Sequence, residues 1–143
     1  MVFCCDCDPA PAERSSRPLS NGVRFTEEEA DLWLNDARNA GKRCQVLLEN
    51  GSAITVCLQF DDMTSCMRLT YDKHCREVPY EHIKRLLSTD RDLRRVETKA
   101  DIQSPEVVAV QLLSSTCIPM RFDSKTDKEI FKELVRKRQP SLD

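Results

Sequence analysis

The fold class of this chain is decided by residues 44–60, which read CQVLLENGSAITVCLQF. Apolar positions alternate on both sides of Asn50-Gly51, and a period of two is typical of a half-buried strand. These positions are Cys44, Val46 and Leu48 before the dipeptide, then Ile54, Val56, Leu58 and Phe60 after it. Asn-Gly is the strongest short hairpin signal, because both positions of a tight two-residue turn need a positive φ. The stretch therefore predicts a β-hairpin.

The alternation continues toward the C-terminus. It predicts strands over 67–71 and 76–80, a weak strand over 94–98, and a convincing pair over 107–113 and 117–122. Residues 82–87 fit either a short helical turn or an extension of a strand. About seven short antiparallel strands result.

A helix is predicted at each end of this strand region. Thr26 and Glu29 form a capping box that starts a helix of about 14 residues, and Gly41 supplies its stop. A second helix is capped by Ser124 or Thr126 and stopped by Pro140. Its apolar stripe consists of Ile130, Phe131, Leu134 and Val135. The basic run 136–138 complements the negative end of that helix.

This order of elements predicts a mostly β (α+β) architecture. An open barrel of about seven antiparallel strands in two orthogonal sheets, with a C-terminal helix capping one open corner, is the pleckstrin-homology-like fold. The N-terminal helix is expected as an addition packed on the outside. The domain is expected over 25–139, followed by a tail over 140–143. Residues 1–24 contain three of the seven prolines and no apolar periodicity, which predicts a disordered N-terminal arm.

Composition excludes several classes of function. The net charge of −2 disfavours a nucleic-acid binder, which normally has a basic excess. Three glycines in 143 residues leave no glycine-rich phosphate loop. The longest nearly apolar run, 107–113, is far shorter than the roughly 18 residues of a spanning helix, and the N-terminus does not have the pattern of a secretory signal. We expect a single intracellular domain without a cofactor.

No catalytic or metal site is predicted. His74 and Cys75 are neighbours in a strand, so they point to opposite faces, and His82 has no acid or nucleophile partner in the sequence. Cys4, Cys5 and Cys7 offer three soft ligands, whereas structural zinc takes four. The chain is therefore expected not to be an enzyme and to hold no metal.

The hairpin also disfavours phosphoinositide binding. Pleckstrin-homology domains that bind head groups place Lys and Arg around this loop to neutralise phosphates. Here the loop over 49–52 reads ENGS, and the return strand over 53–60 also lacks cations.

The eight cysteines fall into two groups. Five lie in or beside predicted strands and are expected to be small buried hydrophobes: Cys44, Cys57, Cys66, Cys75 and Cys117. The other three, Cys4, Cys5 and Cys7, lie at the tip of the arm, where nothing nearby could bury them. Exposed cysteines of this kind are candidates for thioester acylation, and Val2 cannot accept N-myristate because that needs glycine after the initiator Met. Palmitoylation of Cys4, Cys5 and Cys7 is the predicted anchor.

Two stretches carry a resemblance to a known family. They are CQVLLENGSAITV at 44–56 and VPYEHIKRLL at 78–87, which follow the cysteine-tipped arm. The chain resembles the inner membrane complex sub-compartment proteins of apicomplexan parasites such as Toxoplasma, as a pattern over 26–138. Most members pair an acylated cysteine cluster with an N-myristoylated glycine. With Val2 at that position, this chain is most similar to the palmitoylated, non-myristoylated member.

The resemblance implies a non-enzymatic peripheral membrane protein. It implies acyl chains in the membrane on the cytoplasmic side of the inner membrane complex (pellicle), and protein partners, not yet identified, for a scaffold or interaction module. Two alternatives stay open at this stage. One is a phosphoinositide-binding pleckstrin-homology module, and the other is a soluble cysteine-based metal or redox protein.

Overall fold

The computed structural model of the chain describes residues 16–18, 24–94, 96 and 104–142. Seven strands form one antiparallel sheet in the order β6-β5-β4-β3-β9-β8-β7. The strands are β3 (Lys42–Leu47), β4 (Ala53–Asp61), β5 (Cys66–Tyr71), β6 (His74–Pro79), β7 (Ile83–Leu87), β8 (Val107–Leu112) and β9 (Cys117–Arg121). The predicted hairpin is confirmed as β3 and β4, which pair from Lys42–Leu58 to Leu47–Ala53.

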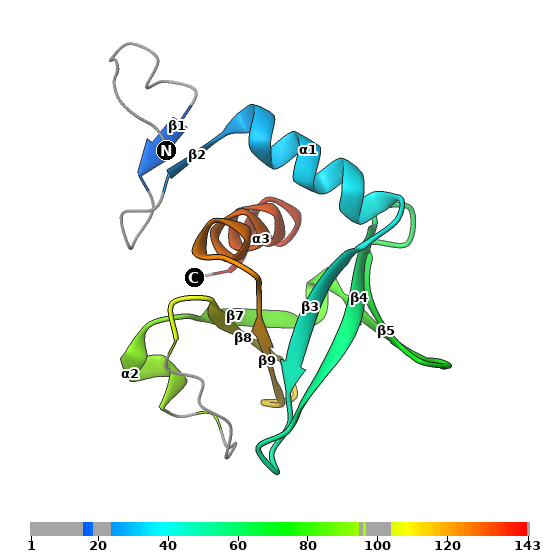
Figure 1. Ribbon diagram of the computed structural model, residues 1–143, viewed down its shortest axis with the longest axis vertical. Coiled ribbons are helices and arrows are strands. Elements are labelled where there is room, and N and C mark those ends of the chain that lie inside the picture. The colour runs from blue at the N-terminus through cyan, green and yellow to red at the C-terminus, as the bar shows by residue number, and fades with distance from the viewer. Residues whose placement is uncertain (1–15, 19–23, 95, 97–103, 143) are drawn as a thin grey trace.

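The sheet curls into a half-barrel (Figure 1). The curl lies where β3 meets β9. These strands pair at two positions, Gln45 with Arg121 and Val46 with Met120, whereas β3 and β4 pair at six, so the two halves of the sheet can diverge there. The barrel is thus one continuous bent sheet, whereas two orthogonal sheets were expected. A single sheet results because β3 is hydrogen-bonded on both sides, to β4 and to β9. The arrangement is the predicted pleckstrin-homology-like one.

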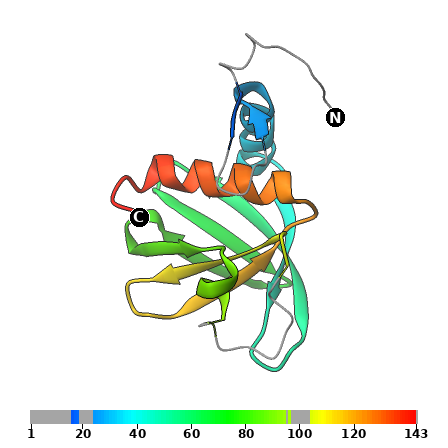
Figure 2. The same cartoon turned by 90° about the vertical axis from the view of Figure 1, so that its left-hand side faces the viewer.

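The C-terminal helix α3 (Lys125–Arg138) lies across the open side of the curled sheet (Figure 2). Ser124, rather than Thr126, caps it, and the Ser124 hydroxyl accepts a hydrogen bond from the Asp127 amide at 3.1 Å. The predicted apolar stripe faces the sheet and is buried: Ile130, Phe131, Leu134 and Val135. The hydrophobic core therefore lies between α3 and the concave face of the sheet.

The N-terminal helix α1 (Glu27–Arg38) begins with the predicted capping box. The Glu29 amide donates to the Thr26 hydroxyl at 3.0 Å, and the Thr26 amide donates to the Glu29 carboxylate at 2.9 Å. The expectation that this helix merely packs on the outside is wrong. Trp33 is buried in the main core, with ring centroids 6.1 Å from Phe60 and 6.3 Å from Phe122. Burial of this large aromatic surface makes α1 part of the domain.

The hairpin turn differs from the expected two-residue form. The Leu48 amide donates to the Ser52 carbonyl at 2.8 Å, and the Gly51 amide donates to the Leu48 carbonyl at 3.0 Å. Of the Asn50-Gly51 pair only Gly51 has a positive φ, 94°. This is a three-residue loop in which one residue takes the left-handed conformation, and glycine supplies it without steric cost.

Two further expectations are changed by the structure. Residues 82–87 contain both proposed elements, since a 3₁₀ turn (Tyr80–His82) leads directly into β7. The weak strand expected over 94–98 falls largely outside the described residues. The described Arg94 lies in a turn after the short helix α2 (Asp90–Leu93).

Both ends of the predicted domain carry additional structure. Composition predicts no regular structure over 1–24, but β1 (Ser16–Pro18) pairs with β2 (Arg24–Thr26). This strand was not predicted, because main-chain hydrogen bonds between strands do not require an apolar sequence pattern. Beyond α3, Leu142 is half-buried against the core. The remainder of the predicted arm, including its three cysteines, lies outside the described residues.

Gly41, between α1 and β3, allows a first test of this structure. Its φ is 91°, and a Cβ added there would collide with the Cys57 sulfur and lie 3.3 Å from the Leu58 carbonyl oxygen. We expect Gly41→Ala to lower the free energy of unfolding by roughly 1–3 kcal/mol in urea denaturation. Adding Cys57→Ala should recover the part due to the collision. Wild-type stability of Gly41→Ala would contradict the described turn.

Candidate functional site

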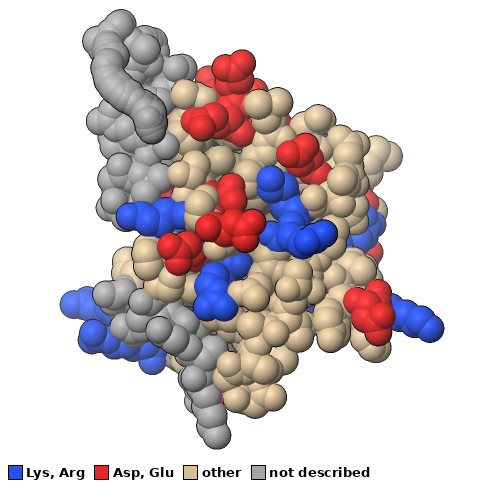
Figure 3. Space-filling view, viewed as in Figure 1, with Lys and Arg blue, Asp and Glu red and all other residues tan. Residues whose placement is uncertain are grey.

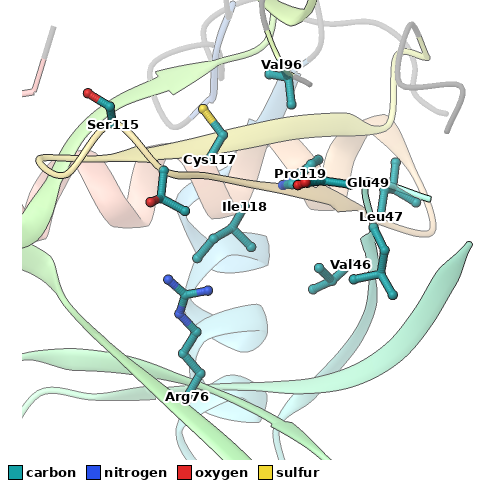
Figure 4. Close-up of a pocket in the computed structure, with 11 residues that line it drawn as sticks. Val46, Leu47, Glu49, Arg76, Val96, Ser115, Cys117, Ile118 and Pro119 are labelled. Atoms are coloured by element: carbon teal, nitrogen blue, oxygen red, sulfur yellow. The ribbon is translucent and has the colours of Figure 1, made fainter. Parts of the chain in front are cut away.

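A groove lies at the end of the half-barrel near the β3–β4 hairpin (Figure 4). It has a volume of about 500 Å³. Its lining is mixed. The apolar part comes from β3, β9 and the segment after α2, and includes Val46, Leu47, Val96, Ile118 and Pro119. The polar part consists of Glu49, Arg76, Ser115 and Thr116. Arg76 of β6 points into the space between the two halves of the sheet (Figure 4). The groove thus combines apolar and polar side chains with one cation.

The electrostatics of this groove do not suit a phosphorylated head group. Arg76 is the one cation among its lining residues, and Glu49 contributes the opposite charge. Head-group recognition relies on several charge-assisted hydrogen bonds to each phosphate. The adjoining loop contains no cation. Its polar groups bond within the turn, since the side-chain oxygen Oδ1 of Asn50 accepts from the Ser52 amide at 2.9 Å and from the Ser52 hydroxyl at 2.6 Å. The loop residues hold the turn together.

This charge distribution leads to a binding prediction. The full chain with Cys4, Cys5 and Cys7 replaced by Ser should show no saturable binding to phosphoinositide liposomes in co-sedimentation at about 0.15 M salt. Weak attraction to exposed lysines and arginines would fade as salt is raised, since the Debye length shortens. Arg76→Ala should leave the result unchanged. Head-group-selective binding at this salt concentration, lost in Arg76→Ala, would contradict the prediction.

The histidines do not join a reactive constellation. His74 and Cys75 are consecutive exposed residues of β6, and His82 is exposed at the end of the 3₁₀ turn. Within the described ranges, no group of three or more His, Cys, Asp or Glu residues could hold a metal ion. The three candidate lipidation residues, Cys4, Cys5 and Cys7, lie outside those ranges.

The five cysteines of the domain divide by burial. Cys44 and Cys66 are buried as expected, and burial raises the pKa of the Cys44 thiol to about 12. Cys57 and Cys117 are half-buried, and burial also raises the pKa of Cys117. Cys75 is exposed, so its expected burial is wrong. It lies on a strand at the edge of the sheet, where no neighbouring strand covers it.

A cluster centred on Asp62 was not visible in the sequence. Its carboxylate accepts from Arg38 of α1 at 2.6 Å and from Arg138 of α3 at 2.8 Å. Arg138, and then Arg38, hold the pKa of Asp62 below its usual value. Arg138 also lies over the Phe60 ring, 5.3 Å from its centroid. Ion pairs at the turn after β4 thereby connect both helices to the sheet. Arg138 makes these tertiary contacts in addition to compensating the negative end of the α3 dipole.

A second unexpected cluster is buried on α3. Glu129 lies between two ammonium groups, 3.2 Å from Lys128 and 3.4 Å from Lys132. All three side chains are at most 3% exposed. Lys132 also donates to the Ser88 hydroxyl at 2.8 Å, and burial lowers its pKa. Buried charges need such partners, so these residues hold α3 against the end of β7.

No helix in the described part of the chain is long and apolar enough to cross a membrane. Together, the fold and this groove with a single lining cation define a pleckstrin-homology-like domain that lacks the cluster of cations typical of head-group binders at its β3–β4 end.

Comparisons with known proteins agree with this class. The family model for the ISP1 C-terminal region matches residues 33–137. The chain is similar to the structure of Inner Membrane Complex (IMC) Sub-compartment Protein 1 (ISP1) from Toxoplasma gondii. Their sequence identity is 32% over 82% of this chain and 96% of that one, with a TM-score of 0.78. The chain belongs to this family of IMC sub-compartment proteins.

A second structure shares the fold at lower identity. IMC Sub-compartment Protein 3 (ISP3) from Toxoplasma gondii is 21% identical over 87% of this chain and 96% of that one, with a TM-score of 0.66. No curated protein sequence matches the chain significantly.

Proposed function

We propose that this protein is a peripheral membrane component of the inner membrane complex, anchored by palmitoylation of Cys4, Cys5 and Cys7. The folded domain acts as a scaffold or protein-interaction module on the cytoplasmic side and catalyses no reaction. The observation that carries the proposal is a cluster of three cysteines at the start of a chain whose domain belongs to the IMC sub-compartment family.

The energetics of lipid anchors favour more than one acyl chain. A single myristoyl chain binds membranes with about 10⁴ M⁻¹, or about 5.5 kcal/mol, so stable anchoring needs a second signal. Residues 1–24 contain Asp6, Asp8 and Glu13 against three arginines, so a polybasic signal is absent from this stretch. Two or three chains on the cysteine cluster meet the requirement by themselves.

The domain itself supports a role in protein interaction. Its β3–β4 loop lacks cations, and the groove beside it is lined by a mixture of apolar and polar side chains with one cation and one anion. Such a surface suits a polypeptide better than a polyphosphorylated head group. Protein partners are therefore the proposed ligands of the domain.

Hydroxylamine treatment of isolated parasite membranes tests the anchor. Hydroxylamine cleaves thioesters at neutral pH and leaves metal–thiolate sites intact. Because it also cleaves Asn-Gly bonds at alkaline pH and the chain contains Asn21-Gly22, the released protein must be full length on a denaturing gel. We expect the protein to move from the pelleted membranes to the supernatant, whereas treatment with a chelator should leave it in the pellet. Retention after complete thioester cleavage would refute acyl anchoring, and release by the chelator alone would favour the metal-binding alternative.

A further inference from the structure

The two edges of the seven-stranded sheet differ in how well they are protected against pairing with another strand. At one edge, the pairing of β7 with β8 is irregular between Ile83 and Arg85, and such a bulge disfavours the addition of another strand. At the other edge, β6 pairs with β5 at six consecutive positions without irregularity. Four consecutive β6 residues, 74–77, are exposed. The β6 edge is therefore regular and open to another strand.

A row of alternating charges runs across the convex face of the sheet to this edge. Arg68 of β5 donates to Glu77 of β6 at 3.0 Å, and it contacts Asp61 of β4 at 2.7 Å. The row reads negative, positive, negative, and it ends at Glu77, whose side chain is 60% exposed. A strand added beside β6 would extend the row if it placed a cation opposite Glu77.

We propose that the β6 strands of two copies of this chain pair antiparallel, which joins the two half-barrels into one continuous sheet. When a twofold axis perpendicular to the sheet relates two antiparallel edge strands, the side chains on the convex face of one copy lie on the convex face of the other. The residue on the axis therefore faces its own copy. With Cys75 on the axis, Lys73 of each copy, the turn residue directly before β6, lies opposite Glu77 of the other, and the charge row continues across the interface. The pairing depends on the domain alone and not on the acylated arm.

The other symmetric registers are less favourable. An axis at Arg76 or at Glu77 would place like charges directly opposite each other, which is destabilising. An axis at His74 would place Glu77 opposite Tyr71, which lies on β5 across the turn. With the axis at Cys75, the remaining pair is His74 of one copy opposite Arg76 of the other. Both lie on the concave side, where the Arg76 side chain points into the groove of its own domain (Figure 4). Acidic and basic side chains also lie side by side at the right-hand margin of the molecule, where the β5–β6 hairpin projects (Figures 1 and 3).

The interface is short, so the dimer is expected to be weak and reversible in solution. In this register only His74, Cys75 and Arg76 of the two β6 strands face each other, and so short a pairing buries far less than the roughly 1,200 Å² of standard stable interfaces. Attachment of both copies to one membrane would raise their effective concentration, and weak pairing would then become populated. Because a twofold interface closes on itself, this pairing yields discrete dimers at the membrane surface.

Disulfide trapping in the full chain tests the register. In a background with Cys4, Cys5, Cys7 and Cys75 replaced by Ser, Lys73→Cys and Glu77→Cys are made separately. Copper-phenanthroline oxidation of their mixture should yield the Lys73→Cys–Glu77→Cys disulfide dimer. Each protein alone should yield at least tenfold less, because identical positions lie four residues apart along the strands, about 14 Å, beyond the roughly 7 Å limit for bridging. Equal yields from the single proteins and the mixture would indicate random collision and overturn the proposal.

A matched control separates edge pairing from face-to-face contact. Thr70 lies opposite Cys75 on β5, one strand inward on the same face. Two copies of Thr70→Cys would be three strand spacings apart, about 14 Å, and should not be trapped. Trapping there would replace edge pairing with packing of the convex faces.

Sedimentation equilibrium gives an independent readout. Lys73→Glu should raise the dimer dissociation constant at least tenfold, since two attractive pairs become repulsive, whereas Lys73→Arg should leave it nearly unchanged. A monomer at all concentrations with no trapped dimer, or equal effects of Glu and Arg, would contradict the proposal.

Discussion

Replacing Cys4, Cys5 and Cys7 together with Ser should shift the protein from the membrane fraction to the soluble fraction of fractionated parasites. Serine preserves the size and polarity of the arm but cannot form a thioester. Each 16-carbon chain contributes about 0.8 kcal/mol for every buried methylene, so removal of all chains eliminates the membrane affinity proposed here. The expected change is nearly complete loss from the membrane pellet.

The single substitutions provide the matched controls. Any one Cys→Ser change leaves two acylation sites, and two chains suffice for stable anchoring, so most of the protein should stay in the pellet. The triple variant should melt at the wild-type temperature, because the buried core residues of the domain lie between Ala30 and Val135. Continued membrane association of a folded triple variant would exclude these cysteines as the anchor.

Phe131→Ala should be the most destabilising single substitution in α3. The Phe131 side chain is completely buried, and its ring centroid lies 5.0 Å from that of Phe122 and 6.1 Å from that of Phe60. Truncation of a buried phenylalanine removes its contacts and leaves a cavity, which costs about 3–5 kcal/mol. This is a large share of the roughly 5–15 kcal/mol stability of an ordinary domain.

Urea denaturation followed by fluorescence measures this effect directly. Trp33 is the single tryptophan of the chain and contacts Phe60 and Phe122 in the same core. Leu32→Ala is the control, because Leu32 precedes Trp33 on α1 but is 64% exposed, and its truncation should cost no more than about 0.5 kcal/mol. Similar costs for the two substitutions would show that α3 does not pack into the sheet as described.

One feature of the candidate site, the absence of cations from the β3–β4 loop, was accessible from the sequence because it rests on residue type. The loop, ENGS, has no cation whichever turn it adopts, and a groove whose lining contains one cation, Arg76, and one anion, Glu49, agrees with the disfavoured head-group binding. The groove itself was not predicted, because its walls come from strands far apart in the chain. The exposure of Cys75 was missed for a related reason: alternation places residues on a face but does not tell which strand lies at the edge.

Interactions between near neighbours could be predicted from the sequence alone. The capping box of Thr26 and Glu29, the cap of α3 and the alternating strands depend on residues two to four positions apart, so the pattern of the chain determines them. The order of β-rich and helical segments then limits the architecture to a half-barrel closed by a helix.

The tertiary structure decided which distant groups meet. Asp62 binds Arg38 and Arg138, which lie 24 and 76 residues away, and the Trp33 indole donates to Asp127 across 94 residues. No local pattern encodes these partners, since they follow from how the sheet curls between β3 and β9. That curl also brings α1 into the core and leaves β6 at a free edge. The strands and helices are thus determined by local periodicity, whereas their partners and the surfaces offered to other molecules are determined by long-range packing.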